Sequence, residues 1–403
     1  MPRKLADRLS AVAPSATLAM AAQAARLRSQ GHKVYSFSVG EPDFEPPRHV
    51  LDAAKAAIDK GVVSHYTAVT GTADLKAAIC AATERDRGYR PTPAEITVSC
   101  GAKHALFNVA LGLYDPGDEV IIPAPYWVSY PEQVRIVGAT PVIVETREEN
   151  GFRMDAASLE RAITERTKAI ILCTPSNPTG SAYSEGELRA LLDVVRRHDV
   201  WLVVDEIYAD LTYDGFRHVS VPAIAEDLRS RTIVISGVSK TYAMTGWRIG
   251  WSVTPPELSK VLDVVQSQST TNATAVAQVA AAAALSGSQD AVREMRDAFA
   301  KRRTRMVEGL RSIPGVRCRM PEGAFYAFAD VRGLYGIPYK NGTIQSDLDV
   351  AMWLLESAHV ASVAGTPFGA PGYVRFSYAC SEGDIDGGIE AICAVVTAAR
   401  GAG

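Results

Sequence analysis

Chemically capable side chains follow four short apolar runs in the middle of the chain. A carboxylate and a phenol come after residues 201–204, a serine and a lysine after 232–235, an amide after 170–173, and an indole after 119–122. If these runs are neighbouring strands of one sheet, a single pocket gathers all six groups, and this convergence predicts a bound ligand. The six residues are Trp127, Asn177, Asp205, Tyr208, Ser239 and Lys240.

The elements that must position these residues alternate between strand and helix. Each apolar run holds four or five residues rich in Val, Ile, Leu or Trp, which suits a sheet buried on both faces. Amphipathic segments lie between the runs, and residues 184–198 open with Ser-Glu-Gly-Glu, a possible capping box. The alternation predicts an α/β domain with a mostly parallel sheet, whose ligand lies off the carboxyl ends of the strands.

The last third of the chain has a different pattern. Residues 288–312 and 347–359 have helical patterns, while 323–328 and 372–378 have strand patterns. This is an α+β arrangement and predicts a second domain. The N-terminal stretch 10–31 is also helical, and we expect it to pack on that domain.

Composition excludes several classes of protein. At 403 residues the chain is long enough for about two or three domains. Its net charge of −3 gives no reason to expect nucleic acid or a membrane as partner. Its six cysteines are scattered without a Cys-x-x-Cys pair, so we expect no metal site and no disulfide framework. No secretory signal is recognisable, and we expect a cytoplasmic protein.

One long segment resembles a known family signature. Residues 237–250 read Gly-Val-Ser-Lys-Thr-Tyr-Ala-Met-Thr-Gly-Trp-Arg-Ile-Gly. They are similar to the pyridoxal-phosphate attachment site of the class I aminotransferases (fold type I), in the bacterial aspartate aminotransferase branch. The resemblance extends over essentially the whole chain from Pro14. Its other matching positions are Asn177, Asp205, Tyr208 and Arg375.

The resemblance implies a fold and a reaction. The fold is α/β, with a large domain whose mostly parallel, mixed seven-stranded sheet is sandwiched by helices, plus a smaller α+β domain built from both termini. We place the N-terminal arm and part of the small domain at residues 1–45, the large cofactor-binding domain at 46–290 and the small C-terminal domain at 291–403. The reaction is a ping-pong amino transfer between aspartate or glutamate and 2-oxoglutarate or oxaloacetate.

The resemblance also implies how the pyridoxal 5'-phosphate is held. Lys240 forms the Schiff base with the cofactor aldehyde and later carries a proton. Asp205 pairs with the ring nitrogen, so that the ring withdraws electrons from the developing carbanion. Tyr208 and Asn177 hydrogen-bond the ring oxygen next to the aldehyde, and Trp127 lies against the ring face.

The phosphate group needs several donors. A β-like run at residues 96–99 precedes an amphipathic helix, whose first N–H groups are suited to an anion. Ser239 adds a hydroxyl and Arg248 a charged fork. By family pattern Tyr66 reaches the phosphate from the other subunit of a homodimer with shared active sites. The helix start is formed by Gly101, Ala102 and Lys103.

The amino acid and 2-oxo acid substrates need a clamp of their own. Arg375 matches the family arginine that grips the α-carboxylate, and the backbone of Gly40 matches a second contact. Trp127 and Asn177 border the same space. Residues 266–272 lack the arginine with which animal-type enzymes bind a distal carboxylate. We therefore expect Lys103 to select aspartate and glutamate.

Three alternatives stay open at this point. Relatives that use prephenate carry a lysine at the position of Ala13, so this activity is less expected here. Aromatic substrates remain possible, because Phe325, Tyr326 and Tyr66 could line the pocket. A β-lyase or decarboxylase on the same fold is the third alternative. A fused DNA-binding regulator is disfavoured by the net charge. We also expect cis peptide bonds before Pro125 and Pro178.

Overall fold

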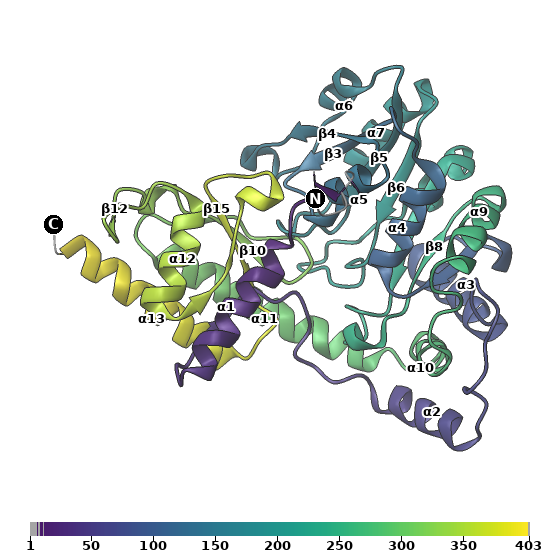
Figure 1. Cartoon of the computed structure of the whole chain (residues 1–403), viewed down its shortest axis with the longest axis horizontal. Coiled ribbons are helices and arrows are strands. Elements are labelled where there is room, and N and C mark those ends of the chain that lie inside the picture. Colours follow the sequence, from purple (N-terminus) through teal and green to yellow (C-terminus); the bar gives the residue numbers. More distant parts are fainter. Residues whose placement is uncertain (1–5, 7–8, 11, 402–403) are drawn as a thin grey trace, which may run out of the picture.

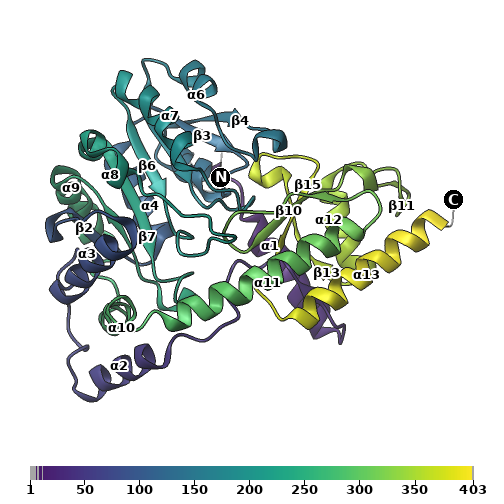
Figure 2. The same ribbon diagram turned by 180° about the vertical axis from the view of Figure 1, so that it is seen from behind.

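A computed structural model describes residue 6, residues 9–10 and residues 12–401 (Figure 1). The elements form two groups, one around a large sheet and one around a small sheet, and the long helix α11 (Asp290–Ser312) extends from one toward the other (Figure 2). Among the described residues no helix is long and apolar enough to cross a membrane.

The large sheet has seven strands in the order β2-β8-β7-β6-β5-β3-β4. Strands β4, β3, β5, β6 and β7 are parallel, whereas β8 is antiparallel to both β7 and β2. The predicted mostly parallel, mixed sheet is therefore confirmed. Its strands are β2 (Ile96–Ser99), β3 (Glu119–Ala124), β4 (Thr140–Glu145), β5 (Thr167–Cys173), β6 (Trp201–Asp205), β7 (Thr232–Gly237) and β8 (Gly250–Val253).

Both faces of this sheet are buried, which explains why the strands have no polar alternation. Successive side chains of a strand point to opposite faces. Accordingly, Ile171 packs with helices α4 and α9, while Ile170 and Leu172 pack with α6 and α7 on the other face. The helices of this group are α2 (Arg48–Asp59), α3 (Ala73–Arg87), α4 (Ala102–Leu113), α5 (Ser129–Ile136), α6 (Ala156–Ala162), α7 (Glu185–Arg197), α8 (Val221–Ile224), α9 (Pro256–Ser267) and α10 (Ala275–Ser286).

The second group combines both ends of the chain. Strand β1 (Tyr35–Ser36) pairs in parallel with β13 (Val360–Ala361), and helix α1 (Ala16–Ser29) packs beside them. The predicted α+β domain built from both termini is thus confirmed, while its exact boundaries remain predictions. The other elements are β9 (Arg317–Cys318), β10 (Tyr326–Asp330), β11 (Pro338–Tyr339), β12 (Gly342–Thr343), β14 (Val363–Ala364), β15 (Tyr373–Ser377), α12 (Asp347–Ala358) and α13 (Glu382–Gly401).

Local predictions agree with the structure except at one helix and one strand. The helix expected over 10–31 spans only Ala16–Ser29, because Ser15 caps its start. Helix α7 begins with the expected capping box, in which Ser184 and Glu187 bond each other's backbone N–H. The peptide bonds before Pro125 and Pro178 are cis as expected, and the bond before Pro175 is cis as well. The strand expected over 323–328 begins only at Tyr326. The preceding Ala324 has φ +58° and donates its N–H to Leu211, outside any ladder.

Candidate active site

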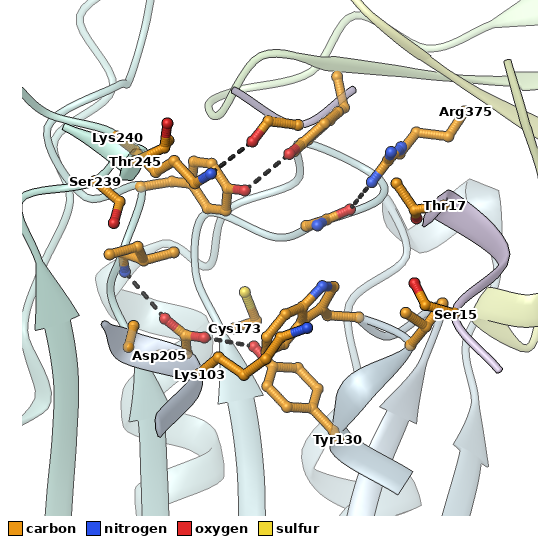
Figure 3. Close-up of a pocket in the computed structure, with 18 of the residues that line it drawn as sticks. Ser15, Thr17, Lys103, Tyr130, Cys173, Asp205, Ser239, Lys240, Thr245 and Arg375 are labelled. Carbon is orange, nitrogen blue, oxygen red and sulfur yellow. Dashed lines mark hydrogen bonds between the residues drawn. The ribbon is translucent and has the colours of Figure 1, made fainter. Parts of the chain in front are cut away.

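A cavity of about 270 Å³ opens where strands β5, β6 and β7 end, beside the start of helix α4 (Figure 3). The sequence analysis expected ligand contacts at this edge of the sheet, and the structure brings most of the predicted residues together there. The predicted residues that line the cavity are Gly40, Ala102, Lys103, Trp127, Asn177, Asp205, Tyr208, Ser239, Lys240, Arg248 and Arg375.

Lys240 follows β7 and projects into this cavity. Its Nζ donates to the carbonyl oxygen of Gly40 at 2.5 Å. Burial lowers the pKa of Lys240 to about 8, and the nearby Arg248 and Arg375 act in the same direction, although the Glu41 carboxylate partly opposes them. A lysine with this pKa is partly neutral near pH 7 to 8. It can therefore act as a nucleophile and as a proton carrier.

Asp205 ends strand β6 at the floor of the cavity and is 3% exposed. One of its carboxylate oxygens accepts the backbone N–H of Ile207 at 3.1 Å, and the other accepts the hydroxyl of Tyr130 at 2.7 Å. Burial raises the pKa of Asp205 to about 6, although both hydrogen bonds act in the opposite direction. The carboxylate therefore titrates close to neutral pH.

Arg375, on β15, is the most deeply buried cation of the site, at 2% exposure. Its guanidinium donates to the side-chain oxygen of Asn177 at 2.8 Å and to the carbonyl oxygen of Ser38 at 2.7 Å. Its Nε is buried without a partner, and no carboxylate of the described residues pairs with it. Burial lowers the pKa of Arg375. A buried cation with free donor capacity is suited to bind an anionic ligand.

Two tyrosines line the cavity beside Arg375. The hydroxyls of Tyr208 and Tyr326 are 2.9 Å apart, and the ring of Tyr326 lies 4.5 Å from the guanidinium carbon of Arg375. A Cβ at Gly40 would lie 2.5 Å from the Tyr326 hydroxyl oxygen. Position 40 therefore requires glycine for this close approach.

The start of helix α4 forms a positively polarised corner of the cavity. Its N-cap Gly101 has φ +91°, and a Cβ there would lie 2.3 Å from an Nη atom of Arg248. That guanidinium donates to the carbonyl oxygen of Thr245 at 2.8 Å and to that of Cys100 at 3.3 Å. The free N–H groups of a helix start and a neighbouring guanidinium favour a phosphate.

Lys103 and Trp127 form one wall of the cavity. The Nζ of Lys103 lies 4.9 Å from the centroid of the indole, within range of a cation–π contact. Burial, together with the positive charge of Arg248, lowers the pKa of Lys103. The ring of Trp127 meets Tyr130 edge to face, with 5.3 Å between centroids.

Three residues named in the sequence analysis do not line the cavity. Gly101 directly precedes the lining residue Ala102, Tyr66 is 89% exposed, and Phe325 is buried in the core of the second group. Sequence reasoning also missed residues that do line it. Tyr130 was detectable only as the residue three positions after Trp127. Ser15, Thr17 and Leu18, at the start of α1, carried no chemical signal beyond their place in the Pro-Ser-Ala-Thr stretch. The other missed residues are Val128, Cys173, Ile207 and Thr245.

The fold and the cavity together define an enzyme of the α/β class, with a buried lysine, a carboxylate and an anion clamp. The family model for class I and II aminotransferases matches residues 32–392. The chain belongs to this family and is an aminotransferase.

Named relatives are similar over nearly the full chain. An aspartate aminotransferase of Rhizobium meliloti (strain 1021) is 46% identical over 96% of this chain and 95% of its own. An aspartate/prephenate aminotransferase of Nitrosomonas europaea is 44% identical over 98% of this chain and 100% of its own. The structure of a Thermus thermophilus aspartate aminotransferase with maleate superposes with a TM-score of 0.92, at 41% identity, over 98% of this chain and 100% of that one.

Proposed function

We propose that this aminotransferase uses pyridoxal 5'-phosphate to move an amino group between aspartate or glutamate and 2-oxoglutarate or oxaloacetate, by a ping-pong mechanism. The observation that carries the proposal is the cavity itself. It holds a lysine with a lowered pKa, a buried carboxylate, and a buried arginine that pairs with no carboxylate of the described residues: Lys240, Asp205 and Arg375.

The residues present fit this cofactor. Its phosphate suits the start of α4 with Ser239 and Arg248, and its ring suits the space between Trp127 and the floor at Asp205. When bound, the cofactor supplies an electron-withdrawing ring. Asp205 would hold a proton on the ring nitrogen. The hydroxyl of Tyr208 and the amide of Asn177 would bind the ring oxygen.

The chain's own residues supply the proton transfer and the substrate orientation. The Nζ of Lys240 would hold the cofactor and, once the substrate amine has displaced it, would be free to take a proton from the substrate's α-carbon; its pKa of about 8 is well matched to this role near neutral pH. Arg375 grips the α-carboxylate and so orients the bond to be broken. The backbone of Gly40 borders the same carboxylate.

Lys103 is proposed to bind the distal carboxylate of the substrate. Its ammonium faces the cavity beside Trp127, and no carboxylate of the described residues pairs with it, which leaves it available for an anionic ligand. The relatives above are named for aspartate, and the Thermus structure holds maleate, a four-carbon dicarboxylate.

Substrate selection is tested with Lys103→Ala. We expect kcat/KM for aspartate to fall about 100-fold, because a charged hydrogen bond is lost, and kcat/KM for phenylalanine to change little. Lys260→Ala, which removes an exposed lysine of α9, is the control. An equal loss on both amino acids rules out a selective role for Lys103.

The reaction type is tested with the absorption spectrum of the purified holoenzyme. A visible band should disappear on addition of aspartate and return with 2-oxoglutarate. Release of a 2-oxo acid from cystathionine without an acceptor would instead indicate a β-lyase. Prephenate, used by relatives such as that of Nitrosomonas europaea, is the alternative acceptor, but Ala13 lacks the lysine associated with it.

We further propose a cytoplasmic homodimer in which Tyr66 completes the partner's phosphate site. Tyr66 is 89% exposed, and the nearby Val62 and Ile58 are 65% and 57% exposed. Large exposed apolar side chains on one short stretch are typical of a protein interface.

A further inference from the structure

The carboxylate of Asp205 has one side-chain donor among the described residues. Its Oδ2 accepts the hydroxyl of Tyr130 at 2.7 Å, while its Oδ1 accepts only the backbone N–H of Ile207 at 3.1 Å. No described arginine, lysine or histidine forms an ion pair with it. A carboxylate buried at 3% exposure therefore depends on a single phenol and a single amide for its hydrogen bonds.

The hydroxyl of Tyr130 is directed at this carboxylate (Figure 3). It belongs to α5, shares a core cluster with Val203 of β6, and is 2% exposed, and it borders the cavity from the buried side. In Figure 3 its hydroxyl points at Asp205 from below the cavity. Burial and the adjacent carboxylate raise the pKa of Tyr130 well above its ordinary value. The phenol therefore keeps its proton and remains a donor throughout the working pH range.

The same phenol ring also supports Trp127. The two rings meet edge to face at 81°, with centroids 5.3 Å apart. Tyr130 therefore connects the carboxylate at the floor of the cavity with the aromatic wall above it. The side chain carries two separable contacts, because removal of the hydroxyl alone leaves the ring contact in place.

The charge balance around Asp205 shows what the hydroxyl contributes. The titratable groups that face it are Tyr130 from α5, Cys173 from β5, Lys240 from the loop after β7, and its own neighbour Glu206. Burial and Glu206 favour the neutral acid, whereas the two hydrogen bonds and Lys240 favour the ion. Loss of the phenolic donor therefore shifts the balance toward the neutral acid, which cannot hold a proton on a ring nitrogen.

We propose that Tyr130 is a positioning residue that keeps Asp205 ionised and directed at the cofactor ring. This inference rests on the proposed function, since the role has meaning only if Asp205 faces pyridoxal phosphate. It assigns Tyr130 a place in the reaction without direct contact with the substrate. The residue acts through the charge of its neighbour.

The test compares Tyr130→Phe with Tyr183→Phe. Each variant loses one buried tyrosine hydroxyl from the elements around the seven-stranded sheet. The hydroxyl of Tyr183 accepts the backbone N–H of Met154, and Tyr183 does not line the cavity. Each variant is first freed of cofactor and titrated with pyridoxal phosphate to obtain the dissociation constant. The visible absorption band of each holoenzyme is then recorded as a function of pH. Steady-state kinetics with aspartate and the thermal midpoint of the apoprotein complete the comparison.

For Tyr130→Phe we expect the cofactor dissociation constant to rise about tenfold, the size of one lost hydrogen bond to a charged group. The pH midpoint of the visible band should rise by about one unit, because a ring without its proton no longer repels positive charge on the Lys240 nitrogen. The kcat should fall about tenfold with KM nearly unchanged, since Arg375 and Lys103 are intact. Tyr183→Phe should lower only the thermal midpoint.

The outcomes separate this inference from the proposed function. If the wild-type protein shows no visible band that responds to aspartate, the proposed function is wrong. If the wild-type protein responds as expected but Tyr130→Phe keeps the wild-type cofactor affinity and pH midpoint, only the role of Tyr130 is wrong. Equal shifts in both variants would reduce Tyr130 to a general packing residue and would also overturn the inference.

Discussion

Burial works against the charge of three side chains in the pocket: it lowers the pKa of Lys240 and Arg375 and raises that of Asp205. In a protein without ligand, such groups destabilise the fold, because charges lose hydration without gaining a partner. Their presence in one cavity is therefore explained by function and not by stability. Replacing one of them with an uncharged residue should increase the free energy of unfolding of the apoprotein.

Lys240→Met should stabilise the apoprotein at low pH. The folded-state pKa of about 8 lies below the ordinary 10.5, so between these two pH values the folded protein binds fewer protons than the unfolded chain. The unfolding free energy therefore decreases as pH falls from 10.5 to 8, and the full penalty of burying the charged lysine applies below pH 8. We expect the variant to gain on the order of 2 kcal/mol in unfolding free energy at pH 6.5, allowing for partial solvation, and progressively less toward pH 10.5.

The measurement is urea denaturation of both apoproteins at pH 6.5 and pH 9.5. Lys260→Met is the control, because it removes an exposed lysine of α9 and should change stability little at either pH. A gain for Lys240→Met that is the same at both pH values would contradict the electrostatic explanation.

Arg375→Lys should weaken every amino acid substrate alike. The change keeps the charge but removes the planar fork, the hydrogen bond to Asn177 and the contact with Ser38. Because all amino acids share the α-carboxylate, we expect kcat/KM to fall about 100-fold for aspartate and for phenylalanine. Steady-state kinetics with both substrates checks this, and a loss confined to aspartate would assign Arg375 to the distal carboxylate instead.

At the scale of elements, the site is formed by strand ends and one helix start. Strands β5, β6 and β7 end at the same edge of the sheet, so the residues after them converge although they are far apart in sequence. Helix α4 begins at the same edge, and its start is closely packed. A Cβ at Gly250 of β8 would lie 2.2 Å from the backbone nitrogen of Ala102. The position of this helix start is therefore set by backbone packing against the sheet.

Gly101→Ala tests that helix start. The new Cβ would displace the guanidinium of Arg248, and we expect the dissociation constant of pyridoxal phosphate to rise about tenfold. Gly117→Ala is the matched control, because Gly117 also has a positive φ, +101°, but a Cβ there meets no atom within 4 Å. Both variants should lose similar stability from backbone strain. Equal cofactor affinity in the two would show that Arg248 does not contact the phosphate.

At the scale of the whole molecule, the site joins parts that are distant in the chain. Arg375 from the C-terminal group bonds Asn177 of the sheet group, and Lys240 bonds the N-terminal Gly40. Helix α1 brings Ser15 and Thr17 to the mouth of the same cavity (Figure 3). The cavity therefore requires both groups of elements to be folded and docked together.

The proposed dimer is tested by mixing Tyr66→Ala with Lys240→Ala chains after reversible denaturation. If Tyr66 acts in the partner's site, each hybrid dimer contains one intact site, and equal mixing restores about a quarter of all sites. We expect the mixture to exceed the activity of either parent, measured at limiting pyridoxal phosphate. Activity that never exceeds the average of the two parents would place Tyr66 in the site of its own chain, or outside both.

The sequence by itself determined five strands of the large sheet (β2, β3, β5, β6 and β7), the α/β class and most of the cavity wall. Continuous apolar runs define strands buried on both faces, and the polar residues after them, such as Asp205 and Lys240, must then share one edge of the sheet. The signature around Lys240 and the matching Arg375 indicated the family. These inferences depend on the local hydrophobic pattern and on the geometry of parallel strands, and both follow from the order of residues in the chain.

Only the tertiary structure decided which side chains touch. The bond from Tyr130 to Asp205 spans 75 positions and that between Tyr208 and Tyr326 spans 118, and no periodicity encodes such pairs. The late start of β10 likewise depends on the N–H of Ala324 bonding Leu211. Many different pairings of side chains are compatible with the same local sequence pattern. Only the close packing of the folded core excludes all of these pairings except the observed one.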